Sequence, residues 1–286
     1  MTSARPFGIV TKADAAHYPG LAALLASLRQ HMESTPVVVL DCGLAPEQRE
    51  TIQRHGARLR TVDVSGYEIR READHGKFTG AIYALLEADL SEWPVTIALD
   101  ADTLVLGDLS EIAQAAMRSG IAAVPDFPPL SLGHQIGNEG ALNQVLGLLP
   151  ELDVGAIAFN AGVLGIRGDY FEERLQPAAR RLIPFHAKLW GNDQAILNLA
   201  AYQANPVAPF EVLDRKYNAR PRYRRAPEIE PPQQTQSPAG PGLNQGGTPI
   251  RVLHFIGHPK PWMHEYPQDC PGLETWRAYA AIAEVA

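Results

Sequence analysis

The feature that most constrains the fold is an alternation of strand-like and helix-like segments over the first hundred residues. Short apolar runs of the kind that form strands lie at residues 7–10, 37–40, 59–64 and 95–99. Segments of helical character separate them at residues 21–28, 46–55 and 75–90. Such alternation is typical of a mostly parallel, doubly wound α/β sheet. Ligands of these sheets bind at the carboxyl ends of the strands.

The last of these strands ends in two carboxylates. Residues 95–102 read Val-Thr-Ile-Ala-Leu-Asp-Ala-Asp, an apolar run that ends in Asp-x-Asp. If the strand continues through the motif, Asp100 and Asp102 point to one face and Ala101 to the other. Two carboxylates on one face suit a hard divalent cation such as Mg²⁺ or Mn²⁺. The motif therefore predicts a metal site where the sheet opens to solvent.

Composition excludes several classes of function. Hydrophobic residues make up 45% of the 286 residues and charged residues 20%, which is typical of an ordinary soluble globular protein. The net charge of −7 argues against a nucleic-acid partner, because phosphate backbones require a broad basic surface. No apolar run approaches about 18 residues, so we expect no transmembrane segment. The N-terminus does not resemble a signal peptide, and Cys42 and Cys270 form no metal or disulfide framework. We therefore expect a cytoplasmic protein.

The second half of the chain is less regular. Residues 157–166 are expected to form a buried strand pair or strand-turn, and helices are expected from Tyr170 and over residues 195–201. Residues 221–249 contain seven Pro and four Gly, a composition typical of an irregular, mobile loop. A further strand is expected at residues 250–255.

Five short blocks, in this order, resemble the family-8 retaining glycosyltransferases, the group of glycogenin and the bacterial lipopolysaccharide galactosyltransferases. Together they extend over about 185 residues. The blocks are Lys77-Phe78, Leu99 to Val105, Phe159 to Val163, Gly191 to Asn198, and His254 to Trp262.

The resemblance implies a GT-A fold, a Rossmann-like, mostly parallel sheet with helices on both faces, fused to an acceptor-binding half. Residues 1–106 would form the nucleotide-sugar-binding half and residues 107–220 the acceptor side. Residues 221–249 would form a flexible loop, and residues 250–286 would close the metal and diphosphate site. The implied activity is metal-dependent transfer of a hexose from a nucleotide sugar, UDP-linked, to a saccharide or other hydroxyl acceptor, with retention of configuration.

The resemblance also assigns site residues. His254 would join Asp100 and Asp102 as a metal ligand, and an imidazole shifts the preference from Mg²⁺ toward Mn²⁺. Asp193 and Gln194 would lie beneath the anomeric carbon as the catalytic pair. The donor would contact the metal carboxylates and the set Thr11, Lys77, Ala101, Asp126, Asn160, Gly257 and Lys260.

Several of these residues have a simpler interpretation as well. His254 taken alone is typical of a core histidine at a strand end, and Lys77 of a solvated helix residue. Asp193 is also a favourable helix N-cap residue, and the two roles are compatible. Asp126 is equally well explained as an ordinary loop carboxylate. The resemblance does not decide between a covalent intermediate and attack on the same face.

One departure concerns the nucleoside. Family members carry a Thr-x-Asn-x-x-Tyr-like segment after the first strand, whereas this chain has Thr11 followed by Ala13 and Ala16 at the Asn and Tyr positions. Uridine is therefore less well supported than the metal site. Two alternatives are a sugar-nucleotide pyrophosphorylase or related nucleotidyltransferase and a non-catalytic nucleotide-sugar-binding protein. The first would require a Gly-rich basic loop that residues 11–20 lack, and the intact metal residues argue against the second.

Overall fold

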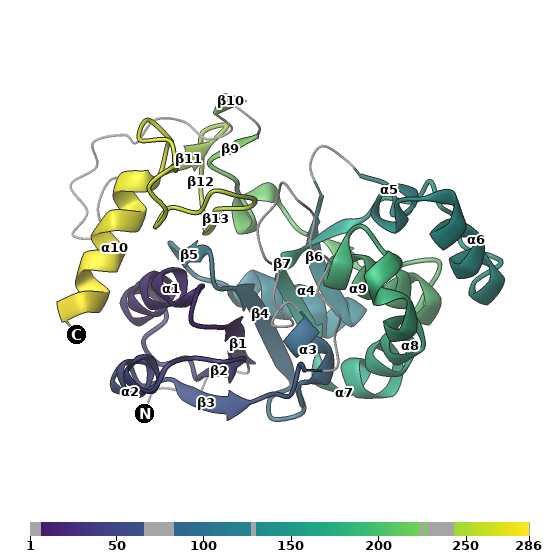
Figure 1. Cartoon of the computed structure of the whole chain (residues 1–286), viewed down its shortest axis with the longest axis horizontal. Coiled ribbons are helices and arrows are strands. Elements are labelled where there is room, and N and C mark those ends of the chain that lie inside the picture. Colours follow the sequence, from purple (N-terminus) through teal and green to yellow (C-terminus); the bar gives the residue numbers. More distant parts are fainter. Residues whose placement is uncertain (1–6, 66–82, 127–129, 224–225, 228–242, 286) are drawn as a thin grey trace.

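A seven-stranded sheet forms the centre of the molecule in the computed structural model, which describes residues 7–65, 83–126, 130–223, 226–227 and 243–285 (Figure 1). The strand order is β3-β2-β1-β4-β7-β6-β8. The strands are β1 (Phe7–Ala13), β2 (Val37–Asp41), β3 (Arg58–Thr61), β4 (Val95–Asp100), β6 (Ile121–Pro125), β7 (Phe159–Arg167) and β8 (Glu211–Val212). Strand β7 is antiparallel to β4 and β6, and the other neighbours are parallel. The predicted mostly parallel sheet is confirmed.

Helices cover both faces of this sheet. The helices in the described part of the chain are α1 (Tyr18–His31), α2 (Pro46–Arg54), α3 (Ala84–Glu87), α4 (Ser110–Ser119), α5 (Leu132–Ile136), α6 (Glu139–Leu148), α7 (Gly168–Tyr170), η2 (Phe171–Leu175), α8 (Gln176–Leu182), η3 (Ile183–Lys188), α9 (Asn192–Ala204), η4 (Arg215–Tyr217) and α10 (Leu273–Val285). Val10 and Ala98 pack in one core with α3, α8 and α9. Ile9 and Ile97 pack in a second core with α1 and α4. Successive strand residues thus face opposite helical layers, as alternation requires.

A small antiparallel sheet brings the C-terminal part of the chain to the end of β4. It pairs β5 (Thr103–Val105) with β13 (Val252–His254), and His254 lies opposite Thr103. Helix α10 packs against α1 on the same side of the molecule (Figure 1). This arrangement places residues 252–255 beside the carboxyl end of β4.

Two predicted elements differ from the structure. Residues 157–166 were expected to form a strand pair or strand-turn, but β7 is one continuous strand. Glycine in this strand allows close packing: a Cβ on Gly165 would lie 2.8 Å from Ile112 Cγ2. Of the helix predicted at residues 75–90, the described part of the chain contains only the short helix α3. Residues 66–82, including Lys77, lie outside the described part.

The segment 221–249 is described only in part. Strand β9 (Arg222–Tyr223) pairs with β10 (Ala226–Pro227), and β11 (Asn244–Gln245) pairs with β12 (Thr248–Pro249). The expected mobility of this segment stays a prediction. No helix in the described part of the chain combines the length and apolar character that crossing a membrane requires.

Candidate metal site

The Asp-x-Asp motif brings its two carboxylates together through a turn. Strand β4 ends at Asp100, residues 101–102 form the turn, and β5 begins at Thr103. Thr103 Oγ1 donates to the Asp100 carbonyl oxygen at 2.8 Å, and Phe255 N donates to the Asp102 carbonyl oxygen at 2.9 Å. The expectation that one strand carries both carboxylates on one face was therefore wrong. The turn and its contact with residue 255 direct Asp102 toward the same site.

His254 completes a group of three possible metal ligands. Its Nε2 atom lies 3.2 Å from Asp102 Oδ1 and 3.9 Å from Asp100 Oδ2. One ligand atom from each of the three residues lies within 4.8 Å of the others. Asp102 and His254 are buried, and Asp100 is half-buried. Gly162 makes room for the imidazole, because a Cβ there would lie 2.0 Å from His254 Cε1.

A hydrogen-bonded asparagine pair fixes the orientation of His254. Gly162 N donates to Asn160 Oδ1 at 3.0 Å, and Asn218 Nδ2 donates to the same oxygen at 2.8 Å. Asn218 must then turn its Oδ1 atom toward His254 Nδ1, 2.9 Å away. An amide oxygen only accepts, so Nδ1 carries a proton, and Nε2 is the ring nitrogen that faces the carboxylates. With Nδ1 held in this way, Nε2 is the nitrogen that would bind a metal.

The same chain of hydrogen bonds continues to three predicted donor and catalytic residues. Gln194 Oε1 accepts from Asn160 Nδ2 at 3.1 Å and from Ala161 N at 3.0 Å. Gln194 Nε2 donates to Asp126 Oδ2 at 2.9 Å. The structure thus brings Asp126, Asn160 and Gln194 into one network that begins at the candidate metal ligand. Asn218 belongs to this network and was not predicted.

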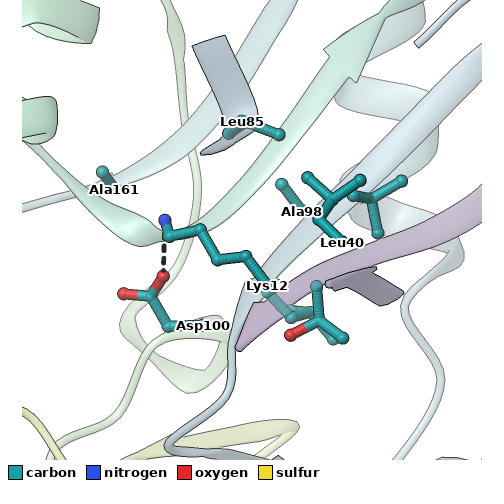
Figure 2. A pocket seen from close by; sticks show the side chains of 9 residues that line it. Lys12, Leu40, Leu85, Ala98, Asp100 and Ala161 are labelled. Carbon is teal, nitrogen blue, oxygen red and sulfur yellow. Dashed lines mark ion pairs between the residues drawn. The ribbon is translucent and has the colours of Figure 1, made fainter. Parts of the chain in front are cut away.

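Two lysines hold the carboxylates at the site. Lys260 Nζ donates to Asp102 Oδ2 and, at 3.2 Å, to the Phe255 carbonyl oxygen. Lys12 Nζ forms an ion pair with Asp100 Oδ1 (Figure 2), at 3.0 Å, and lies 3.3 Å from Asp193 Oδ2. Burial alone would raise the pKa of Asp102, but Lys260 and His254 outweigh it and lower this pKa. Burial alone would lower the pKa of Lys12, but Asp100 and Asp193 outweigh it and raise it. Asp102 therefore stays an anion and Lys12 a cation.

Asp193 lies in the first turn of α9, where Gly191 occupies the N-cap position. The interpretation of Asp193 as the N-cap itself was wrong by two residues. Asn192 precedes it with φ of 50°, a left-handed conformation that Asn tolerates better than most residues. Burial raises the pKa of Asp193, and the charge of Asp100 acts in the same direction, while Lys12 opposes the shift. A carboxylate buried beside a candidate metal site is typical of functional positions.

The remaining predicted residues lie around this centre. Thr11 is buried in β1, next to Lys12, and Ala101 is buried in the turn between the two metal carboxylates. Gly257 has φ of 84°, which a side-chain-bearing residue adopts only with strain. Gly257 lies three residues after His254 and three before Lys260, in the segment that covers the site. Lys77 lies outside the described residues.

Comparisons with known proteins agree with this architecture. The family model described as glycosyl transferase family 8 matches residues 8–265. The galactosyltransferase LgtC, solved with donor and acceptor sugar analogs, is similar in structure, with a TM-score of 0.64 and 20% identity over 96% of this chain and 95% of that one. The bifunctional glycosyltransferase WbbM gives a TM-score of 0.66 and 18% identity over 96% of this chain and 49% of that one. The glycosyltransferase GlyE of Streptococcus pneumoniae gives a TM-score of 0.58 and 19% identity over 96% of this chain and 61% of that one. The sequence comparison with curated proteins gives no match. These likenesses confirm the GT-A type fold.

Proposed function

Because the chain belongs to glycosyl transferase family 8, we propose that it transfers a hexose from a nucleotide sugar to a hydroxyl acceptor. The family and the GT-A fold support a glycosyltransferase. The finer proposal is a UDP-linked donor, a saccharide acceptor, Mn²⁺ as the metal and retention of the anomeric configuration. The donor and acceptor analogs bound to LgtC, a protein of similar fold, support the substrate classes. The cytoplasmic location stays a prediction.

The observation that carries this proposal is the group of Asp100, Asp102 and His254 at the carboxyl edge of the sheet. Two carboxylates with an imidazole whose Nε2 atom faces them fit a divalent cation, and the nitrogen ligand favours Mn²⁺ over Mg²⁺. These three residues would hold the metal. When bound, it supplies positive charge that stabilises the leaving diphosphate.

The protein's own groups supply the rest of the chemistry. Lys260, beside Asp102, adds a point charge on the diphosphate side. The backbone at Gly257 would approach the diphosphate closely, because no side chain intervenes there. Lys77 is proposed to make a further phosphate or sugar contact, and Thr11 and Ala101 to contact the nucleoside half of the donor.

Asp193 and Gln194 are proposed to act at the anomeric carbon, where an oxocarbenium-like transition state develops. The carboxylate of Asp193 would stabilise that positive charge. Gln194 is held from two sides by Asn160 and Asp126, so its amide is preorganised for the donor sugar. Asp126 and Asn160 are proposed to contact the sugar hydroxyls from the same network.

A screen of nucleotide sugars by thermal unfolding tests this function. UDP-, GDP- and CMP-linked sugars would each be measured with Mn²⁺ and with EDTA, because a ligand that binds only the native state raises the melting temperature. We expect stabilisation by UDP-hexoses, and only with Mn²⁺. Stabilisation that does not depend on metal would contradict the proposal. Stabilisation by a nucleoside triphosphate with a sugar 1-phosphate would instead favour a nucleotidyltransferase.

A further inference from the structure

The candidate site contains a lysine that comes from the middle of the central sheet. Lys12 lies on β1, in register with Asp100 on the neighbouring strand β4. Charged side chains are rarely buried unless they are paired, yet only 13% of the Lys12 side chain is exposed. Its ammonium group contacts Asp100 Oδ1 at 3.0 Å and Asp193 Oδ2 at 3.3 Å. Lys12 therefore joins a candidate metal ligand to the proposed catalytic carboxylate.

The surroundings of Lys12 keep its ammonium group at these two carboxylates. The stem lines a small hollow that opens to solvent, together with Leu40, Leu85, Ala98 and Ala161 (Figure 2). None of these four side chains can accept a hydrogen bond, whereas both carboxylates can. A lysine stem packs favourably on such apolar walls while its charged end reaches a polar partner. Lys12 is thus a fixed charge of the site.

The contact with Asp100 leaves one oxygen for a metal. Lys12 holds Oδ1, while Oδ2 is the oxygen that faces His254 Nε2. A cation bound by Asp100, Asp102 and His254 would therefore share the Asp100 carboxylate with the Lys12 ammonium. Two positive charges on one carboxylate repel each other, and this repulsion is strong in a partly buried site.

The charges of the site show the consequence of that repulsion. The three carboxylates of Asp100, Asp102 and Asp193 and the two ammonium groups of Lys12 and Lys260 sum to one net negative charge. A divalent cation alone would change this to one net positive charge. The diphosphate of a donor would restore a negative total. Without Lys12, a divalent cation alone would neutralise the site.

We propose that Lys12 is a built-in counter-ion of the metal site, which keeps the affinity for a free divalent cation low and makes metal binding depend on the donor's diphosphate. This inference rests on the proposed metal-dependent function. Lys12 is a positioning residue in this role, because it acts on the metal through Asp100. Its effect is a thermodynamic coupling between cation and nucleotide.

The test measures binding of Mn²⁺ by the loss of the free-ion EPR signal, first with protein alone and then with saturating UDP. K12M removes the charge, and K12Q removes it while keeping a hydrogen-bonding end, so K12Q provides the test if K12M does not fold. K12R keeps the charge. K188M, at an exposed lysine that contacts Gln144, is the control for the overall change in net charge.

We expect K12M and K12Q to bind Mn²⁺ alone about tenfold or more tightly than the wild type, with a smaller change when UDP is present. K12R and K188M should behave like the wild type. Unchanged or weaker binding of Mn²⁺ alone by both neutral variants would overturn the role of Lys12 and leave the proposed function standing. Failure of the wild type to bind Mn²⁺ even with UDP would overturn the metal-dependent function itself, and the role of Lys12 with it.

Discussion

Replacement of Asn218 by alanine should weaken metal binding without touching a metal ligand. Asn218 Oδ1 accepts the hydrogen bond from His254 Nδ1 and so fixes the ring orientation that presents Nε2 to Asp100 and Asp102. In Asn218→Ala the Nδ1 proton loses this acceptor, and the ring is free to change tautomer or rotate. Loss of an orienting partner of a histidine ligand typically lowers metal affinity by about 10–100-fold.

The same change should lower stability by a smaller and separable amount. His254 is only 2% exposed, so its unpaired N–H group costs about 1–3 kcal/mol of unfolding free energy. Asn160, the other hydrogen-bond partner of Asn218, is less affected, because its Oδ1 atom still accepts from Gly162 N. Urea unfolding measures this loss, and isothermal titration of Mn²⁺ in the presence of UDP measures the affinity.

Two variants separate orientation from general destabilisation. Asn218→Asp keeps an acceptor for His254 Nδ1 and should retain most of the metal affinity. Asn198→Ala is the matched control, because Asn198 is fully buried and hydrogen-bonds to Phe159 and Gln194 backbone atoms rather than to His254. It should lose stability and keep its metal affinity. A folded Asn218→Ala variant with wild-type Mn²⁺ affinity would refute the argument.

Three further predictions concern single carboxylates. Asp102→Asn should abolish Mn²⁺-dependent UDP binding, measured by calorimetry, while circular dichroism shows an intact fold. Asp193→Asn should lower kcat of donor turnover by about 100-fold or more and change donor affinity little, because the lost interaction belongs mainly to the transition state. The third concerns pH: burial alone would raise the pKa of Asp41, but hydrogen bonds from Arg49 and two backbone N–H groups outweigh it and lower the pKa. The stabilisation is present above the ordinary value of 3.8 and is lost as pH falls toward the folded-state pKa. The destabilisation caused by Asp41→Asn in urea unfolding should therefore shrink below about pH 4. If Asp41→Asn destabilised the protein equally at pH 7 and in acid, a lowered pKa of Asp41 would be contradicted.

The sequence predicted the sheet well because its signals are local. Apolar runs bounded by turn residues gave β1, β2, β3 and β4, and helical periodicity gave α1, whose leucines are buried as expected. The prediction for β7 was less accurate, because residues 159–167 form one continuous strand that contains Gly162. Gly162 leaves space for His254, which lies far along the chain.

The sequence predicted which residues form the site better than it predicted how they are arranged. Asp100, Asp102 and His254 do come together, although a turn rather than strand alternation places Asp102. Asn218 was missed because its partners, Asn160 and His254, are separated from it by 58 and 36 residues. A lysine within a buried strand requires a carboxylate partner, but the first strand was expected to end at Val10, whereas β1 continues to Ala13 and so includes Lys12.

The most direct test of the proposed function follows the donor itself by ¹H NMR. The protein would be incubated with UDP-hexoses, with a catalytic amount of Mn²⁺ or with EDTA, and with saccharide acceptors present or absent. We predict that a UDP-hexose is consumed only when Mn²⁺ is present and that the first product keeps the donor's anomeric configuration. Asp102→Asn should show no consumption. Metal-independent consumption, a product of inverted configuration, or failure to consume any nucleotide sugar would contradict a metal-dependent retaining glycosyltransferase.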